Sequence, residues 1–112
     1  MDFTEYQLLC KRTDNGNLNS KELRLLNWCL GIGGESGELL NKMKKKIFHQ
    51  KSIDVKEIEE EIGDVLWYLA ILAYDLNLDF NTVVESNIKK LMIRYPNGFS
   101  LERANNRLDK VR

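Results

Sequence analysis

Two pairs of carboxylates carry the strongest chemical signal in this sequence. Glu35 and Glu38 are three residues apart, and Glu61 and Asp64 repeat the same spacing. Residues i and i+3 share one face of an α-helix, so each pair would direct two carboxylates toward a single spot. Four facing carboxylates need a cation, because like charges held close together raise each other's pKa. Carboxylate oxygens suit Mg²⁺ or Mn²⁺, which bind acidic side chains together with substrate phosphates.

Two alternative chemistries agree less well with these residues. A di-iron carboxylate bundle requires a Glu-x-x-His motif on two helices, and the single histidine, His49, lies outside both pairs. The segment from Gly31 to Ser36 is not a dinucleotide fingerprint, because Ser36 replaces the third glycine and no strand precedes it. On spacing alone, two solvated acid pairs arising by coincidence stay a third possibility.

The elements that must hold these pairs are predicted to be helices. Four segments are predicted to be helical, at about 3–11, 20–48, 54–76 and 80–95, and three of them follow a capping residue, namely Asp2, Asp54 or Asp79. The sequence from Pro96 to Gly98 ends the fourth segment, and SLERANNR can add a short final turn. We therefore predict an all-α fold, either a four-helix-bundle-like domain or half of a larger bundle.

Apolar stripes on two of these segments border the acid pairs. One stripe comprises Ile58, Ile62, Val65, Leu69, Leu72, Ala73 and Leu76, and the other comprises Leu23, Leu26, Leu30, Gly34 and Gly37. Glu61 lies at the edge of the first stripe, and Glu38 borders the second. We expect the glycines to let a helix or a ligand approach the backbone closely and so bring the two acid pairs together.

The fourth segment offers side chains that suit phosphate. Asn87, Lys90 and Arg94 share one helix face and could meet phosphate oxygens, although a cationic last turn stabilised by the helix dipole is equally consistent. Among the aromatic residues, Tyr68 is the best candidate to reach a ligand, because it follows Asp64 by one turn on the same face.

The composition fits one soluble globular domain. The chain has 112 residues, of which 43% are hydrophobic and 30% charged, and it is small enough that self-association would help to bury surface. Its 17 basic and 17 acidic residues favour no nucleic-acid partner. We expect a solvated helix end at Lys42, Lys44, Lys45 and Lys46 rather than a patch that binds nucleic acid. Without CxxC spacing or a signal peptide, Cys10 and Cys29 are predicted to be reduced core residues of a cytoplasmic protein. No apolar run approaches the roughly 18 residues that a membrane span needs.

Three stretches together are similar to a known family. GESGELLNKMKK, EEEIGDVLWYLAILA and SNIKKLMIRYPNGFS resemble the MazG-like nucleoside triphosphate pyrophosphohydrolases of the all-α NTP pyrophosphatase superfamily. The resemblance covers about residues 28–107, and its signature is an ExxE pair followed by an ExxD pair. Many members carry a further acid directly before the first pair. This chain has Gly34 there, which leaves open whether Glu57, Glu60 or no residue supplies that ligand.

The resemblance implies an enzyme that requires Mg²⁺, with Mn²⁺ as an alternative. It would cleave a nucleoside triphosphate between the α and β phosphates, giving a monophosphate and pyrophosphate, and would act as a homodimer or homotetramer. The implied metal ligands are Glu35, Glu38, Glu61 and Asp64. The implied nucleotide contacts are Asn87 and Lys90, with Tyr68 and Arg94 as further candidates. Glu38 is the candidate to orient or deprotonate the attacking water.

The predicted domain spans residues 1–112, with an N-terminal helix and loop at 1–19, core helices at 20–95 and a C-terminal tail at 96–112. Two other functions stay open at this point. One is a catalytically inactive helical module that binds nucleotide or metal and has a regulatory role, and the other is a structural helical adaptor. The presence of all four signature carboxylates favours the enzyme.

Overall fold

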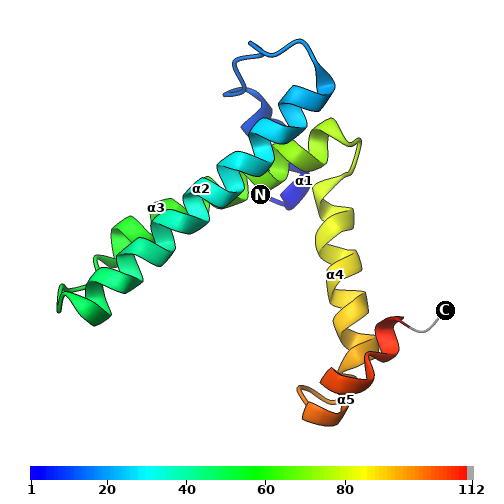
Figure 1. Cartoon of the computed structure of the whole chain (residues 1–112). Coiled ribbons are helices and arrows are strands. Elements are labelled where there is room, and N and C mark those ends of the chain that lie inside the picture. Colours follow the sequence, from blue (N-terminus) through cyan, green and yellow to red (C-terminus); the bar gives the residue numbers. More distant parts are fainter. Residues whose placement is uncertain (111–112) are drawn as a thin grey trace.

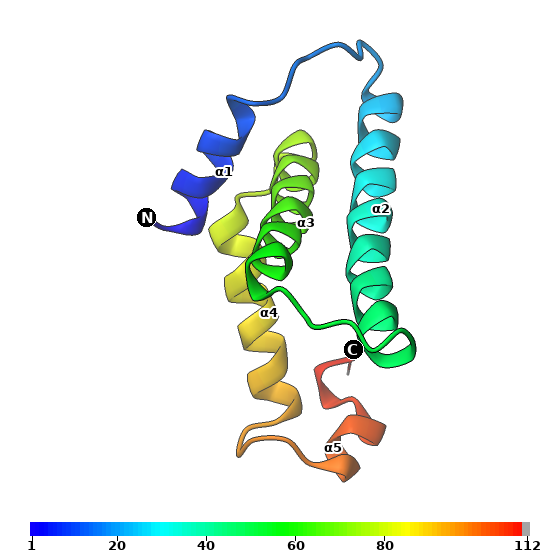
Figure 2. The same ribbon diagram turned by 90° about the vertical axis from the view of Figure 1, so that its left-hand side faces the viewer.

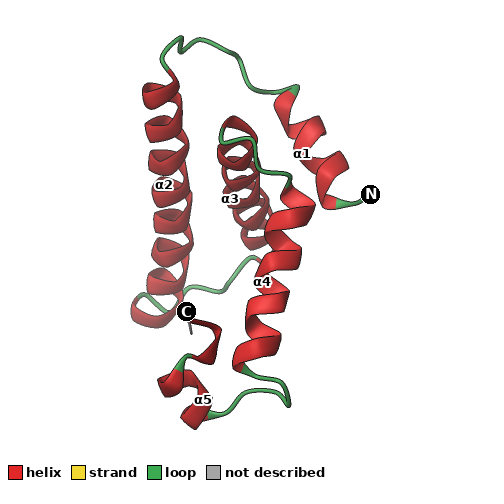
Figure 3. Cartoon of the chain, turned by 90° about the vertical axis from the view of Figure 1, so that its right-hand side faces the viewer, coloured by secondary structure: helices red, strands yellow, loops and turns green. Residues whose placement is uncertain are grey.

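The computed structural model describes residues 1–110, and every regular element in that range is a helix (Figure 3). The elements are α1 (Phe3–Lys11), α2 (Lys21–Phe48), α3 (Val55–Asp75), α4 (Phe80–Arg94) and α5 (Leu101–Asn106), followed by a 3₁₀ turn at Leu108–Lys110. The all-α prediction is confirmed. The predicted bounds of α1 to α4 agree with the observed ones to within one residue.

Side-chain caps explain why these bounds follow from the sequence. Asp2 and Ser20 each accept a hydrogen bond from the backbone N–H three residues later, at the starts of α1 and α2. Asp54 and Asp79 each accept from the N–H two residues later, at the starts of α3 and α4. The caps satisfy N–H groups that have no partner within the helix, so each helix has a defined first residue.

The helices form two diverging arms. α2 and α3 lie side by side as an antiparallel hairpin, and α1 packs across the C-terminal half of α3 (Figures 1 and 2). α4 leaves this unit at an angle and carries α5 at its far end (Figure 1). The radius of gyration is 17.3 Å, whereas a compact domain of this length has about 13 Å. The single chain therefore does not close a four-helix bundle by itself.

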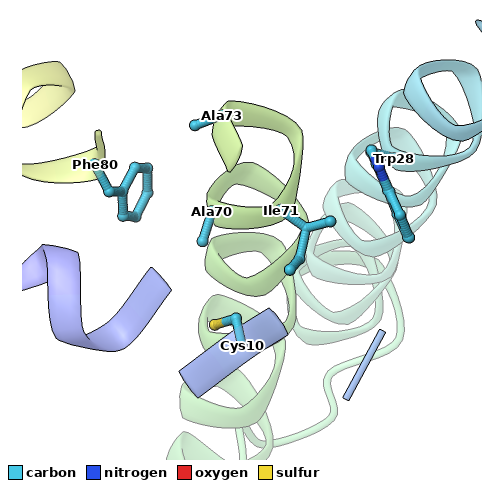
Figure 4. Close-up of a cluster of buried hydrophobic side chains, with 6 residues drawn as sticks. All are labelled: Cys10, Trp28, Ala70, Ile71, Ala73 and Phe80. Atoms are coloured by element: carbon cyan, nitrogen blue, oxygen red, sulfur yellow. The ribbon is translucent and has the colours of Figure 1, made fainter. Parts of the chain in front are cut away.

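The buried core lies where the four long helices meet. It comprises Cys10, Trp28, Ala70, Ile71, Ala73 and Phe80 (Figure 4). Gln7 is the buried polar residue beside it: its Nε2 donates to the carbonyls of Ala70, at 3.1 Å, and Leu78, at 2.9 Å. Its Oε1 accepts from the backbone N–H of Phe80 at 3.1 Å. One side chain thus ties α1 to the end of α3 and the start of α4.

Much of the predicted apolar surface is exposed in the single chain. On α3, Ile62 is 56% exposed and Leu76 is 44% exposed. The α2 stripe at Leu23, Leu26 and Leu30 is more than half exposed along its length.

The prediction of two core cysteines is wrong for Cys29, which lies on the surface, whereas Cys10 is buried. No helix described between residues 1 and 110 combines the length and apolar character needed to cross a membrane.

A different face of α2 meets α3. It runs through Leu25, Trp28, Ile32, Glu35, Leu39 and Lys42, all of which are buried or half-buried. The close approach occurs at Gly31, where a Cβ atom would overlap the ring of Tyr68. A Cβ atom added at Gly34 or at Gly37 would meet nothing within 4 Å. The expectation that these two glycines bring the acid pairs together is therefore wrong, and Gly31 takes that role.

Replacing Gly31 with Ala should lower the free energy of unfolding by about 1–3 kcal/mol, because the added methyl group overlaps the Tyr68 ring. Gly33→Ala is the matched control: its Cβ meets nothing within 4 Å, and Ala should stabilise the helix interior by about 0.5–1 kcal/mol. Urea unfolding followed by circular dichroism measures both variants. Equal stability of the two would contradict the close approach at Gly31.

Candidate metal centre

Three carboxylates converge between α2 and α3. Glu35 comes from α2, and Glu61 and Asp64 come from α3. One oxygen atom of each lies within 4.8 Å of the others. Glu35 and Glu61 are half-buried, whereas Asp64 is exposed, so the cluster lies at the surface of the hairpin. The two acid pairs predicted from their spacing therefore both contribute to one cluster.

The electrostatics of this cluster favour a cation. Glu61 Oε2 is enclosed by protein atoms and has no hydrogen-bond partner among the described residues. A hydrogen bond with Glu61, burial, and the charges of Glu61, Asp64 and Glu38 raise the pKa of Glu35 to about 7. Without a cation, the cluster therefore holds a proton near neutral pH. A divalent ion bound by oxygen ligands would replace that proton and satisfy the enclosed oxygen.

Glu38 stands apart from these three side chains. It is exposed on α2 one turn beyond Glu35, and it is not among the three residues whose oxygens come together. Its charge still contributes to the raised pKa of Glu35. The structure thus brings three of the four predicted ligands into one set and leaves Glu38 beside it.

Lys42 is a neighbour of the cluster that sequence reasoning missed. Its Nζ donates to Glu57 Oε2 at 3.2 Å, and its side chain is 26% exposed. That hydrogen bond, together with the charges of Glu57, Glu61 and Glu38, raises the pKa of Lys42. The sequence carried a signal, because positions 35, 38 and 42 share one helix face. The surrounding run of lysines instead favoured a solvated helix end.

Tyr68 lies on α3 one turn beyond Asp64, and its contact with a ligand stays a prediction. Its half-buried ring lies against Gly31 and packs with the rings of Trp28 and Trp67, at centroid distances of 6.3 Å and 5.1 Å. It also lines a cavity of about 170 Å³ together with Asn27 and both tryptophans. The aromatic rings and the amide that line this cavity are groups that can contact a nucleoside.

The predicted contacts on α4 lie on the other arm of the chain. Asn87 and Lys90 are exposed on a helix that diverges from the α2–α3 hairpin (Figure 1). Arg94 is paired with Asp109: its Nε donates to Oδ1 at 2.7 Å, and its Nη2 donates to Oδ2 at 2.9 Å. This pairing holds the pKa of Asp109 well below its usual range. It also fastens the C-terminal turn to α4.

The fold and the cluster define a class of protein: an all-helical chain with a carboxylate-rich candidate metal centre between two antiparallel helices. Residues 24–99 match the MazG nucleotide pyrophosphohydrolase domain. The chain belongs to this family, which confirms the resemblance seen in its acid pairs.

One relative extends the comparison. The chain is 37% identical over 73 residues to the Gene 37 protein of Mycobacterium phage L5, a match that covers 62% of this chain and 64% of that protein. The chain thus matches slightly less than two-thirds of the relative's length. No solved structure matches the chain significantly.

The stability of the metal-free protein should fall as pH rises through about 7. The pKa of Glu35 is raised from 4.5 to about 7 in the folded state. Between these two pH values the native protein therefore binds more protons than the unfolded chain. The free energy of unfolding decreases as pH rises across this range, and the contribution of the protonated Glu35 is lost above it. The melting temperature in EDTA, measured between about pH 5 and pH 8, tests this expectation.

Glu35→Gln should flatten that pH profile, and added Mg²⁺ should raise the melting temperature of the wild-type protein above pH 7. If the wild-type and Glu35→Gln proteins had parallel pH profiles in EDTA, the carboxylates would not be coupled as described.

Proposed function

We propose that this protein is a Mg²⁺-dependent nucleoside triphosphate pyrophosphohydrolase. It cleaves between the α and β phosphates and releases a nucleoside monophosphate and pyrophosphate. The observation that carries the proposal is the enclosed Glu61 oxygen without a partner, set among three converging carboxylates. Membership of the MazG nucleotide pyrophosphohydrolase domain family supports it.

The donor set fits Mg²⁺, because every ligand offered is a carboxylate oxygen. Glu35, Glu61 and Asp64 would hold the ion, with Glu38 available from the next turn, and Mn²⁺ would suit the same oxygens. When bound, the ion neutralises charge on the phosphates and lowers the pKa of a water molecule.

The chain itself supplies a base and a contact for the nucleoside. Glu38 lies outside the tight set of three, so its carboxylate is free to accept the proton of the attacking water. As the bond from the water oxygen to the α-phosphorus forms, the bond from that phosphorus to the α–β bridging oxygen breaks, and pyrophosphate leaves. Tyr68, one turn beyond Asp64, would contact the nucleoside.

A second copy of the chain would cover the apolar surface that one chain leaves exposed. An apolar groove of about 800 Å³ runs between α3 and α4 and is lined by Leu66, Leu69, Phe80, Val83, Val84 and Ile88. Large exposed side chains such as Ile88, Met92 and Ile93 extend the apolar surface along α4. A surface of this extent marks an interface, and the extended shape of the single chain argues for a partner of the same sequence.

In such a homodimer or homotetramer, we propose that α4 of one protomer brings Asn87 and Lys90 to the acid cluster of its partner. This arrangement accounts for the separation of these two residues from the cluster within one chain. Arg94, which is engaged by Asp109, would position the C-terminal turn rather than bind phosphate.

The reaction is tested by incubating the purified protein with a panel of ribo- and deoxyribonucleoside triphosphates, with Mg²⁺ or with EDTA. Monophosphate and pyrophosphate should form only with Mg²⁺. Mg²⁺ binding without turnover of any nucleotide would indicate an inactive binding module. Diphosphate and orthophosphate would show that a different bond is cleaved.

Glu38→Gln should lower kcat by about a hundredfold or more, because the proton acceptor is lost, while the helical circular dichroism spectrum is unchanged. Glu59→Gln, an exposed acid of α3 that pairs only with Lys56 at 3.6 Å, is the matched control and should retain wild-type turnover. Full activity in Glu38→Gln would rule out Glu38 as the base.

Active sites that combine residues of two protomers are tested by co-expressing two variants expected to be inactive, Glu61→Gln and Lys90→Ala. In a mixed dimer, one site carries both substitutions and the other carries neither, so about a quarter of wild-type activity should return. Co-expression of Glu61→Gln with Asp64→Asn, both on α3, is the control that should stay inactive. No recovery in the first pair would place Lys90 outside the partner's site.

A further inference from the structure

The α2–α3 loop lies at one end of the hairpin (Figure 2). A charged pocket lies beside this loop. It has a volume of about 180 Å³ and lies between the last turns of α2 and the first turn of α3. Three lysines line it, namely Lys42, Lys45 and Lys51, against two acids, Asp54 and Glu57. The pocket therefore carries a net positive charge.

The loop after α2 folds back to bring the lysines together. The Lys45 carbonyl accepts the backbone N–H of His49 at 3.0 Å and that of Lys51 at 3.2 Å. Gln50 adopts a left-handed conformation with φ of 53°, which turns the chain over the end of the helix. As a result, Lys51 returns beside Lys45, although it lies six positions later in the sequence.

The two acids of the pocket are already engaged. Asp54 caps α3 by accepting the backbone N–H of Lys56 at 3.0 Å. Glu57 accepts from Lys42 at 3.2 Å. Within residues 1–110, neither Lys45 nor Lys51 forms an ion pair, so both ammonium groups can bind an anion.

The pocket and the acid cluster lie on the same face of α2. Positions 35, 38, 42 and 45 follow one face of α2. Glu35 and Lys42 are seven residues apart, or about 10 Å along the helix axis. The electrostatic influence of Glu61 and Glu38 on Lys42 is consistent with a pocket that adjoins the cluster.

We propose that Lys42, Lys45 and Lys51 form a subsite for the pyrophosphate end of the substrate, that is, for the β and γ phosphates of a nucleoside triphosphate whose α phosphate lies at the acid cluster. This subsite deepens the proposed function and rests on it. An ammonium group is a compact charge with three donors, which suits phosphate oxygens. Lys42 exchanges Glu57 for phosphate when the substrate binds.

The subsite fixes the orientation of the bound nucleotide. Its nucleoside lies toward Tyr68, and its terminal phosphates lie toward the α2–α3 loop. A monophosphate cannot reach the lysines, so they distinguish the pyrophosphate product and the triphosphate substrate from the monophosphate product.

The direct test is calorimetric titration of the purified full chain with inorganic pyrophosphate in the presence of Mg²⁺. Lys42→Met and Lys45→Met should each weaken pyrophosphate binding by about tenfold and leave monophosphate binding unchanged. Lys44→Met and Lys46→Met are matched controls, because both lysines are exposed on α2 and outside the pocket. Their affinity should stay within about twofold of wild type. Lys45→Met does not disturb the ion pair with Glu57, and circular dichroism checks the fold of each variant.

Absence of pyrophosphate binding to the wild-type chain would overturn the subsite, as would equal weakening in all four variants. Pyrophosphate binding does not require turnover, so the two proposals can fail separately. Lysine-dependent pyrophosphate binding by a chain that hydrolyses no nucleotide would uphold the subsite and contradict the proposed function.

Discussion

The contact between Gly31 and Tyr68 is the constraint on which the candidate site depends. The Tyr68 ring occupies space that any side chain at position 31 would fill, so the two helices approach closely at this point. The contact also sets the antiparallel register of the hairpin. One turn beyond Gly31 on α2 is Glu35, and one turn before Tyr68 on α3 is Asp64. The same packing that holds the Tyr68 ring against α2 therefore places the carboxylates of the two helices face to face.

This register creates an unfavourable group of charges that the isolated chain only partly relieves. Glu35 holds a proton at a raised pKa, Glu61 keeps one oxygen without a partner, and Lys42 provides a nearby positive charge that is held by Glu57. A divalent ion and a triphosphate together would relieve all three. The apolar surfaces of α2, α3 and α4 are also unfavourable in the isolated chain, because they are exposed to solvent.

The sequence predicted local features well and long-range ones poorly. Three helix starts followed from caps at Asp2, Asp54 and Asp79, because a cap acts within a few residues. The shared face of each acid pair followed from helix geometry. The face of α2 that meets α3 did not, since both faces carry apolar residues and only tertiary packing selects one. Two further features depend on partners distant in sequence. Gln7 on α1 binds the start of α4, where α4 diverges from the hairpin, and Arg94 pairs with Asp109.

In the proposed reaction, a water molecule attacks the α-phosphorus at the carboxylate cluster. Turnover of a nucleoside triphosphate in ¹⁸O-labelled water, followed by mass spectrometry of both products, tests it most directly. Attack at the α-phosphorus predicts one labelled oxygen in the monophosphate and none in the pyrophosphate. Label in the pyrophosphate would mean attack at the β-phosphorus and would contradict the proposed position of the substrate across the acid cluster and the lysine pocket.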